Sequence, residues 1–156
     1  TEKYLNLTVL LKENINSFDE IYAKALYNLG GTYSRLGNFD AHKMLTIKAL
    51  DAEKNIYGPE SPQVISTYAS LITAYIELKQ YSKALELTDI ACRIADLNEK
   101  KADPGHIAFL FNNIGVLYNS TGDYSRSKIY LEKEEEFYQK SGYLSMEGKI
   151  NLMNSL

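Results

Sequence analysis

The chain has 156 residues, of which 45 % are hydrophobic and 24 % are charged, a balance typical of a folded globular domain. Its net charge of −3 argues against nucleic acid or a membrane surface as the main partner, because both are negatively charged. No apolar run reaches the roughly 18 residues that a membrane-spanning helix needs, no signal peptide opens the chain, and a single cysteine excludes an internal disulfide. We therefore expect a cytoplasmic protein.

Two helices are predicted near the start of the chain. Residues 3–12 are rich in leucine and indicate a helix with an apolar face. A capping box then begins at Ser17, whose hydroxyl can accept a hydrogen bond from a free backbone N–H while Glu20 reaches back to the cap. We place the next helix at residues 18–36.

Prolines mark the boundaries of the helices that follow. A polar turn at Asn38 leads into a helix that runs to about residue 56. Pro59, Pro62 and Pro104 all fall outside the interiors of the predicted helices, as expected because proline inside a helix removes a backbone hydrogen bond.

Ser61 and Asp103 each precede a proline in the arrangement of an N-cap followed by proline in the first helical turn. We expect a helix to begin at each of them. The paired second helices are predicted at residues 81–98 and 124–140. A last helix is expected from Ser145 onward.

One pattern recurs three times along the chain. Tyr33, Tyr75 and Tyr118 lie 42 and 43 residues apart, and each follows apolar residues at helical spacing. The matching positions are Leu26, Leu29, Gly30, Gly37 and Phe39 in the first copy, Tyr68, Leu71, Ile72, Lys79 and Tyr81 in the second, and Phe111, Ile114, Gly115, Gly122 and Tyr124 in the third. A fixed period of this length, carrying a helix–turn–helix unit, predicts a solenoid.

This register resembles the tetratricopeptide repeat (TPR), whose signature includes Leu-Gly, a following Tyr and an aromatic residue in the second helix. The long period, with Tyr57-Gly58-Pro59-Glu60-Ser61-Pro62 between repeats, is similar to the kinesin-light-chain type of TPR. The resemblance implies an all-α fold, a right-handed α-solenoid of antiparallel helix pairs.

On this map the whole chain, residues 1–156, is a single TPR domain. The repeats cover residues 18–56, 61–98 and 103–140. Residues 1–12 are the second helix of a partial repeat, and residues 145–156 start a fourth. The chain is therefore expected to be a segment of a longer array.

Three positions depart from the TPR pattern. His42 stands where a small residue is expected, Lys79 replaces a turn glycine, and Glu134 replaces an alanine. We expect less tight helix packing at these places and no change of fold. Gly30 and Gly115 are expected where two helices nearly touch.

The sequence offers no convergent catalytic groups, so we predict no enzyme, no cofactor and no metal site. His42 and His106 lie on different helices, and we interpret the first as a packing substitution and the second as a surface residue. Cys92 is expected to be a small core residue. The acidic run at residues 132–136 is either a solvated helix face or a surface for a basic partner.

In TPR arrays the first helix of each repeat lines a concave groove, and the resemblance places the candidate binding residues there. They are Lys24, Tyr27, Asn28 and Arg35 in repeat one, Ser70, Thr73 and Glu77 in repeat two, and Phe109, Asn112, Asn113 and Val116 in repeat three.

Asn28, Ser70 and Asn113 occupy equivalent positions, and Ser155 continues the row. An asparagine amide can both donate to and accept from a peptide bond. The pair Asn112-Asn113 looks like the asparagines with which kinesin-light-chain repeats grip a peptide backbone. The alternative is that these residues are merely tolerated on a solvated helix face.

We predict a protein–protein interaction scaffold that binds an extended peptide or a partner helix in this groove. Tyr27 and Gly31 replace the lysine and asparagine with which chaperone-tail TPR grooves hold a terminal carboxylate, which argues against that ligand. The alternative is a ligand-sensing regulatory array that controls an attached effector domain of a larger protein. Apolar residues near both ends, such as Tyr4, Leu7 and Met153, also predict end-to-end self-association.

Overall fold

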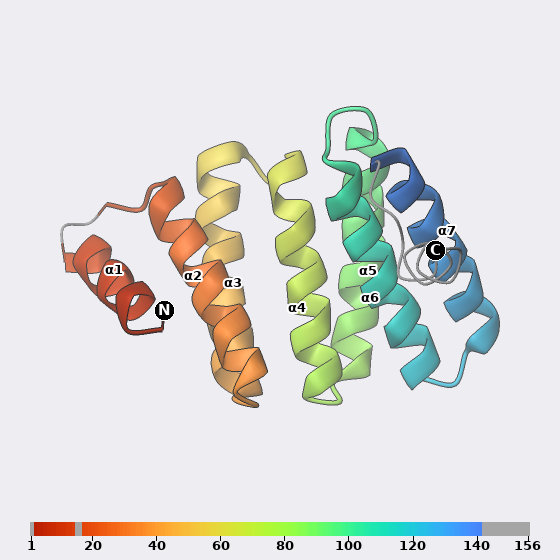
Figure 1. Cartoon of the computed structure of the whole chain (residues 1–156), viewed down its shortest axis with the longest axis horizontal. Helices are drawn as coiled ribbons and strands as arrows, with labels where there is room; N and C mark the ends of the chain where they lie inside the picture. Colours follow the sequence, from red (N-terminus) through yellow and green to blue (C-terminus); the bar gives the residue numbers. More distant parts are fainter. Residues whose placement is uncertain (1, 15–16, 142–156) are drawn as a thin grey trace, which may run out of the picture.

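The computed structural model describes residues 2–14 and 17–141, and these contain seven α-helices, one short 3₁₀ helix and no strand (Figure 1). The α-helices are α1 (Glu2–Asn14), α2 (Glu20–Arg35), α3 (Phe39–Tyr57), α4 (Ile65–Glu77), α5 (Tyr81–Asn98), α6 (Pro104–Ser120) and α7 (Tyr124–Ser141), and the 3₁₀ helix η1 (Pro62–Val64) directly precedes α4. The predicted start of a fourth repeat, with Met153 and Ser155, lies outside the described residues.

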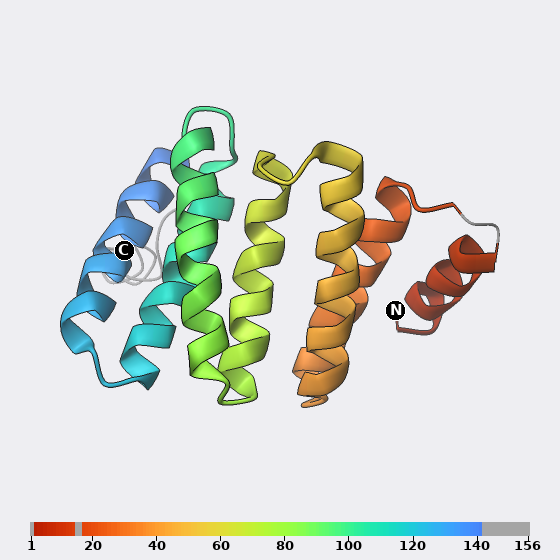
Figure 2. The ribbon, with the colours of Figure 1, turned by 180° about the vertical axis from the view of Figure 1, so that it is seen from behind.

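The helices stand in a row of antiparallel pairs, α2 with α3, α4 with α5 and α6 with α7 (Figure 1). Helices α2, α4 and α6 form the near layer in Figure 1, and α3, α5 and α7 form the near layer in the reverse view of Figure 2. Helix α1 packs against α2 at one end. The architecture is the predicted all-α solenoid, and none of the described helices is long and apolar enough to cross a membrane.

N-terminal caps account for where several helices begin. Asp19 caps α2, since its carboxylate accepts a hydrogen bond of 3.1 Å from the backbone N–H of Tyr22. The Ser17 hydroxyl instead donates to Asp19 at 3.1 Å, so the capping box predicted from Ser17 is wrong by two residues. Asp103 caps α6 as predicted, whereas Ser61 makes no capping hydrogen bond.

The turn inside each helix pair contains one residue in the left-handed backbone region. Gly37 and Gly122 have φ angles of 76° and 82°, and Lys79 has a φ of 56° at the equivalent place. A residue with a Cβ atom pays roughly 1–2 kcal/mol for this conformation. The substitution at Lys79 therefore keeps the turn and places strain in it.

Two glycines lie where the helices of a pair approach closely, as predicted. A Cβ atom added to Gly115 would lie 2.8 Å from Leu131 Cδ2, and one added to Gly30 would lie 3.2 Å from Thr46 Oγ1. Protein interiors are close-packed, so a side chain at either glycine displaces its neighbour. Gly31, the next residue, would meet nothing within 4 Å.

The buried core falls into two clusters. One joins α1, α2 and α3 around Leu26 and Ala49. The other extends from Leu50 of α3 through η1, α4 and α5 to α6, and Cys92 lies half-buried against it rather than fully inside. Between the two clusters, His42 of α3 forms polar contacts with Ser70 and Glu77 of α4.

Helix α1 covers one side of α2 and buries a single residue, Val9. Tyr4, Leu7 and Leu11 are each more than half exposed. Self-association through this apolar surface stays a prediction.

Candidate functional site

A polar cluster connects α2, α3 and α4. His42 of α3 is 2 % exposed, and its Nδ1 lies 2.8 Å from Glu77 Oε2 while its Nε2 lies 3.1 Å from Ser70 Oγ. The hydroxyl of Ser34 donates to the other oxygen of Glu77 at 2.6 Å. We call Ser34, His42, Ser70 and Glu77 the polar cluster. Because both polar ring atoms of the buried imidazole are engaged, it is stable inside the fold.

His42, predicted as a packing substitution, is buried as part of a hydrogen-bonded contact between helix pairs. The imidazole fits because it lies beside Gly30, whose added Cβ would be 3.5 Å from His42 Cδ2. A histidine at a position that faces the next helix pair requires polar partners there. The need for a polar partner on α4 is the feature of the sequence that indicates a pairing with Glu77. The repeat pattern places Glu77 in the groove instead.

The order of contacts from Ser70 through His42 to Glu77 is also that of a serine hydrolase triad. Ser70, however, lies inside α4, where backbone N–H groups bond to carbonyls one turn earlier. Acyl transfer needs free donors beside the nucleophile to hold the oxyanion. We therefore interpret the polar cluster as a structural contact between helix pairs.

A pocket of about 440 Å³ opens on the layer of α2, α4 and α6, and Ser34, His42 and Ser70 of the polar cluster form part of its wall. We call it the groove pocket. Six of the predicted binding residues line it, namely Tyr27, Asn28, Arg35, Ser70, Thr73 and Phe109. Side chains from three helices thus meet around one hollow, with aromatic rings and amide, hydroxyl and guanidinium groups together.

The structure places other predicted residues outside the groove pocket. Lys24 is exposed and pairs with Glu20 one turn earlier on α2. Glu77 belongs to the polar cluster, and Val116 is exposed on α6 without lining the pocket.

The two adjacent asparagines have partners within the chain. Asn113 is buried, its Nδ2 donates to the carbonyl of Phe109 at 3.0 Å, and its Oδ1 accepts from Thr73 Oγ1 at 2.9 Å. Asn112 Nδ2 donates to Glu134 Oε2 of α7 at 3.0 Å, and burial raises the pKa of Glu134. An amide has two donors and two acceptor sites, so these contacts use part of its capacity. Peptide binding by either residue stays a prediction.

A second pocket, of about 320 Å³, lies where α2 and α3 meet the start of α4. We call it the Glu53 pocket, after the buried carboxylate of α3 that borders it. Tyr27 lines both pockets, so the two are adjacent. His106, predicted as a surface residue, is exposed at its edge.

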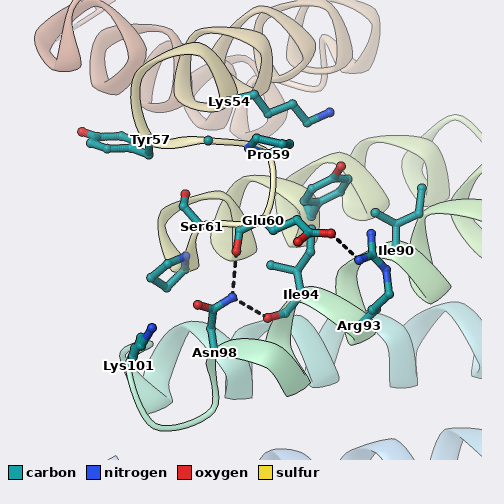
Figure 3. A pocket seen from close by; sticks show the side chains of 13 residues that line it. Lys54, Tyr57, Pro59, Glu60, Ser61, Ile90, Arg93, Ile94, Asn98 and Lys101 are labelled. Atoms are coloured by element: carbon teal, nitrogen blue, oxygen red, sulfur yellow. Dashed lines mark hydrogen bonds and ion pairs between the residues drawn. The ribbon is translucent and has the colours of Figure 1, made fainter.

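The connection between α3 and η1 borders a third hollow, of about 620 Å³, which lies over α5 (Figure 3). Asn98 Nδ2 donates to the carbonyls of Glu60 and Ile94 at 2.8 and 2.9 Å, and Arg93 pairs with the Glu60 carboxylate. These contacts tie the connecting segment to α5. We therefore assign this hollow a structural role.

Comparison with known proteins identifies the repeats. Two family models, both described as tetratricopeptide repeat, match residues 21–96 and 110–133, together more than half of the chain. The chain belongs to the tetratricopeptide repeat family, which confirms the resemblance inferred from the recurring tyrosines. Repeats of this family generally mediate interactions between proteins.

The fold is also similar to the crystal structure of BtubC (BKLC) from P. vanneervenii, with a TM-score of 0.77 at 20 % sequence identity. The match covers 90 % of this chain and 56 % of BtubC, so the chain spans little more than half of that protein. At this identity the similarity shows the fold alone. No curated protein matches the sequence.

Proposed function

We propose that this chain binds a protein partner by holding an extended peptide segment or a helix in the groove pocket. The observation that carries the proposal is the meeting of Tyr27, Asn28 and Phe109, from two separate helices, around one hollow. Binding sites for peptides combine apolar walls with a few polar groups that fix the backbone.

The exposure of the lining residues supports this proposal. Asn28 and Arg35 are exposed, and the Asn28 side chain can offer a donor and an acceptor to a peptide bond. Tyr27 and Phe109 are half-buried, so each presents part of its ring to the pocket from a fixed position. Rigid aromatic anchors of this kind dominate the energetics of many protein interfaces.

The test begins with random peptides displayed on phage and selected on the whole chain, followed by calorimetry of the enriched sequences. We expect Tyr27→Ala and Phe109→Ala to weaken binding roughly 10- to 100-fold, and Asn28→Ala roughly 10-fold. Asn55→Ala is the matched control, because Asn55 is exposed on α3 and lines none of the three pockets.

Thermal unfolding of each variant separates lost binding from lost folding. Peptides that bind all three groove variants with wild-type affinity would contradict the proposal. So would a binding footprint, measured by amide chemical shifts, that falls on α5 and α7.

A further inference from the structure

Glu53 is a buried carboxylate that the surrounding protein leaves without a full set of partners. It is 9 % exposed, and its Oε2 accepts no hydrogen bond from the described residues. The neighbouring Thr67 hydroxyl is likewise without a hydrogen bond of ordinary geometry in this part of the chain. Burial raises the pKa of the Glu53 carboxyl to about 7, and the Thr67 hydroxyl opposes the rise. Oε2 itself is closed off from solvent, and the part of Glu53 that stays exposed borders the pocket. A donor that contacts the carboxylate there stabilises its charge.

The rest of the Glu53 pocket is suited to a positive charge. Tyr27, Tyr57, Gln63 and Ser66 contribute aromatic faces and polar oxygens. The pocket also has two basic side chains in its lining: Lys24, which is already paired with Glu20, and the exposed His106 of α6.

Two tyrosines of this pocket have raised pKa values, and burial is the main cause for both. Burial, followed by the charge of Glu53, raises the pKa of the Tyr27 hydroxyl. Burial, followed by the charge of Glu20, raises the pKa of Tyr57. Glu20 of α2 and Glu53 of α3 both border this pocket, and Lys24 partly offsets the charge of Glu20.

We propose that the Glu53 pocket binds a basic side chain, arginine or lysine, of the protein partner. A guanidinium or ammonium group donates charge-assisted hydrogen bonds to a carboxylate and is attracted to aromatic faces. The pocket volume of about 320 Å³ lies at the low end of the roughly 300–1,000 Å³ of ligand pockets, so the pocket has room for one side chain.

This inference rests on the proposed function, since it names one chemical feature of the partner. Tyr27 borders both pockets, so a peptide in the groove pocket lies next to the Glu53 pocket. One basic side chain of that peptide then reaches Glu53 while the backbone remains beside Asn28.

The first experiment uses a probe that requires no known partner. N-acetyl-arginine amide is titrated into isotope-labelled protein at pH 8, where Glu53 is ionised, and the neutral isostere N-acetyl-citrulline amide is the control ligand. We expect the arginine probe to shift the amide signals of Ala23 and Ser66, and the citrulline probe to bind roughly tenfold more weakly or not at all.

Two variants locate the effect. Glu53→Gln keeps the shape of the side chain and should remove the preference for arginine over citrulline. Glu86→Gln, on the exposed surface of α5 and outside all the pockets described above, should preserve it. Equal binding of the two probes to wild type, or an unchanged preference in Glu53→Gln, overturns the inference.

The second experiment separates this inference from the proposed function. Each basic residue of a selected peptide is replaced by citrulline, and we expect one replacement to cost roughly tenfold in affinity for wild type and little for Glu53→Gln. Peptides that bind the groove pocket without any such position overturn the inference and leave the proposed function standing. Binding of the arginine probe beside Ala23 and Ser66, with no peptide binding, supports a basic ligand for the Glu53 pocket and contradicts the proposed function.

Discussion

Two junctions between successive helix pairs differ in chemistry. Where α3 meets α4, His42 bonds to Glu77 and Ser70, and polar atoms of Thr67 and Glu53 are buried nearby. Where α4 and α5 meet α6, the contact is mainly a continuous apolar cluster with fully buried leucine and isoleucine side chains.

The difference shows where a solenoid can acquire a binding site. The positions equivalent to His42 are Ala84 and Ser127, both small and buried. The large polar residue His42 lies at the polar junction between α3 and α4. Both the groove pocket and the Glu53 pocket lie at that junction. Specific polar groups gather where continuous apolar packing is interrupted.

The largest expected change in the free energy of unfolding follows from a substitution at the apolar junction, where α4 and α5 meet α6. Leu110 is completely buried, so Leu110→Ala should lower the free energy of unfolding by about 2–5 kcal/mol through lost apolar contact and a residual cavity. Urea denaturation measures this change, and Leu36→Ala is the control because Leu36 is mostly exposed. A loss no greater than that of the control would mean that the cluster is not the main stabilising contact.

The polar junction should respond next. His42→Ala removes a buried ring together with the hydrogen-bond partner of Glu77 Oε2 and of Ser70 Oγ, which should cost about 2–4 kcal/mol. His106→Ala, at an exposed position, is the matched control. Hydrogen exchange should become faster in α2 and α3 before α6, and uniform acceleration along the chain would contradict a local role.

Glu53 makes the stability of the polar junction depend on pH. Its pKa is raised to about 7 in the folded state from an ordinary value of 4.5, so folding favours the protonated form. The associated stability is present below about pH 4.5 and is lost as pH rises through 7. Glu53→Gln should therefore gain about 2 kcal/mol over wild type at pH 8 and much less at pH 5.

Denaturation of both proteins across this pH range measures the gain. Glu86→Gln serves as the control, because its carboxylate is exposed. A difference between Glu53→Gln and wild type that stays constant from pH 5 to pH 8 would show that Glu53 does not titrate in this interval.

The smallest expected effect concerns the turn after α4. Lys79 has a positive φ angle, so Lys79→Gly should raise the free energy of unfolding by about 1 kcal/mol. Gly122→Ala, at the equivalent turn, should lower it by a similar amount for the same reason. Opposite signs in a thermal unfolding experiment confirm the shared geometry, and a destabilised Lys79→Gly contradicts it.

The fold was largely predictable because repeated short-range patterns specify it. The spacing of Tyr33, Tyr75 and Tyr118 placed the helix pairs, and Asp103 before a proline marked the start of α6. The start of α2 was misplaced because Ser17 and Asp19 are both good N-cap residues two positions apart.

The candidate site was less predictable. The sequence indicates on which face of a helix a residue lies, but it does not identify the side chain that the residue contacts in the folded protein. Asn112 was expected to be available to a peptide, yet it bonds to Glu134, 22 residues away on α7. His42 and Glu77 are separated by 35 residues and lie on different helix pairs. Such contacts depend on how helices are inclined to one another, both within a pair and between pairs, which local patterns do not determine.

The polar cluster also has a mechanical consequence. Hydrogen bonds are directional and weaken steeply when stretched or bent, so the contact between His42 and Glu77 fails over a small displacement. Apolar surfaces attract without a preferred direction and can slide while remaining in contact. A solenoid under tension would therefore yield first between α3 and α4. A partner that occupies both the groove pocket and the Glu53 pocket would hold α3 and α4 in a fixed arrangement and make this contact more rigid.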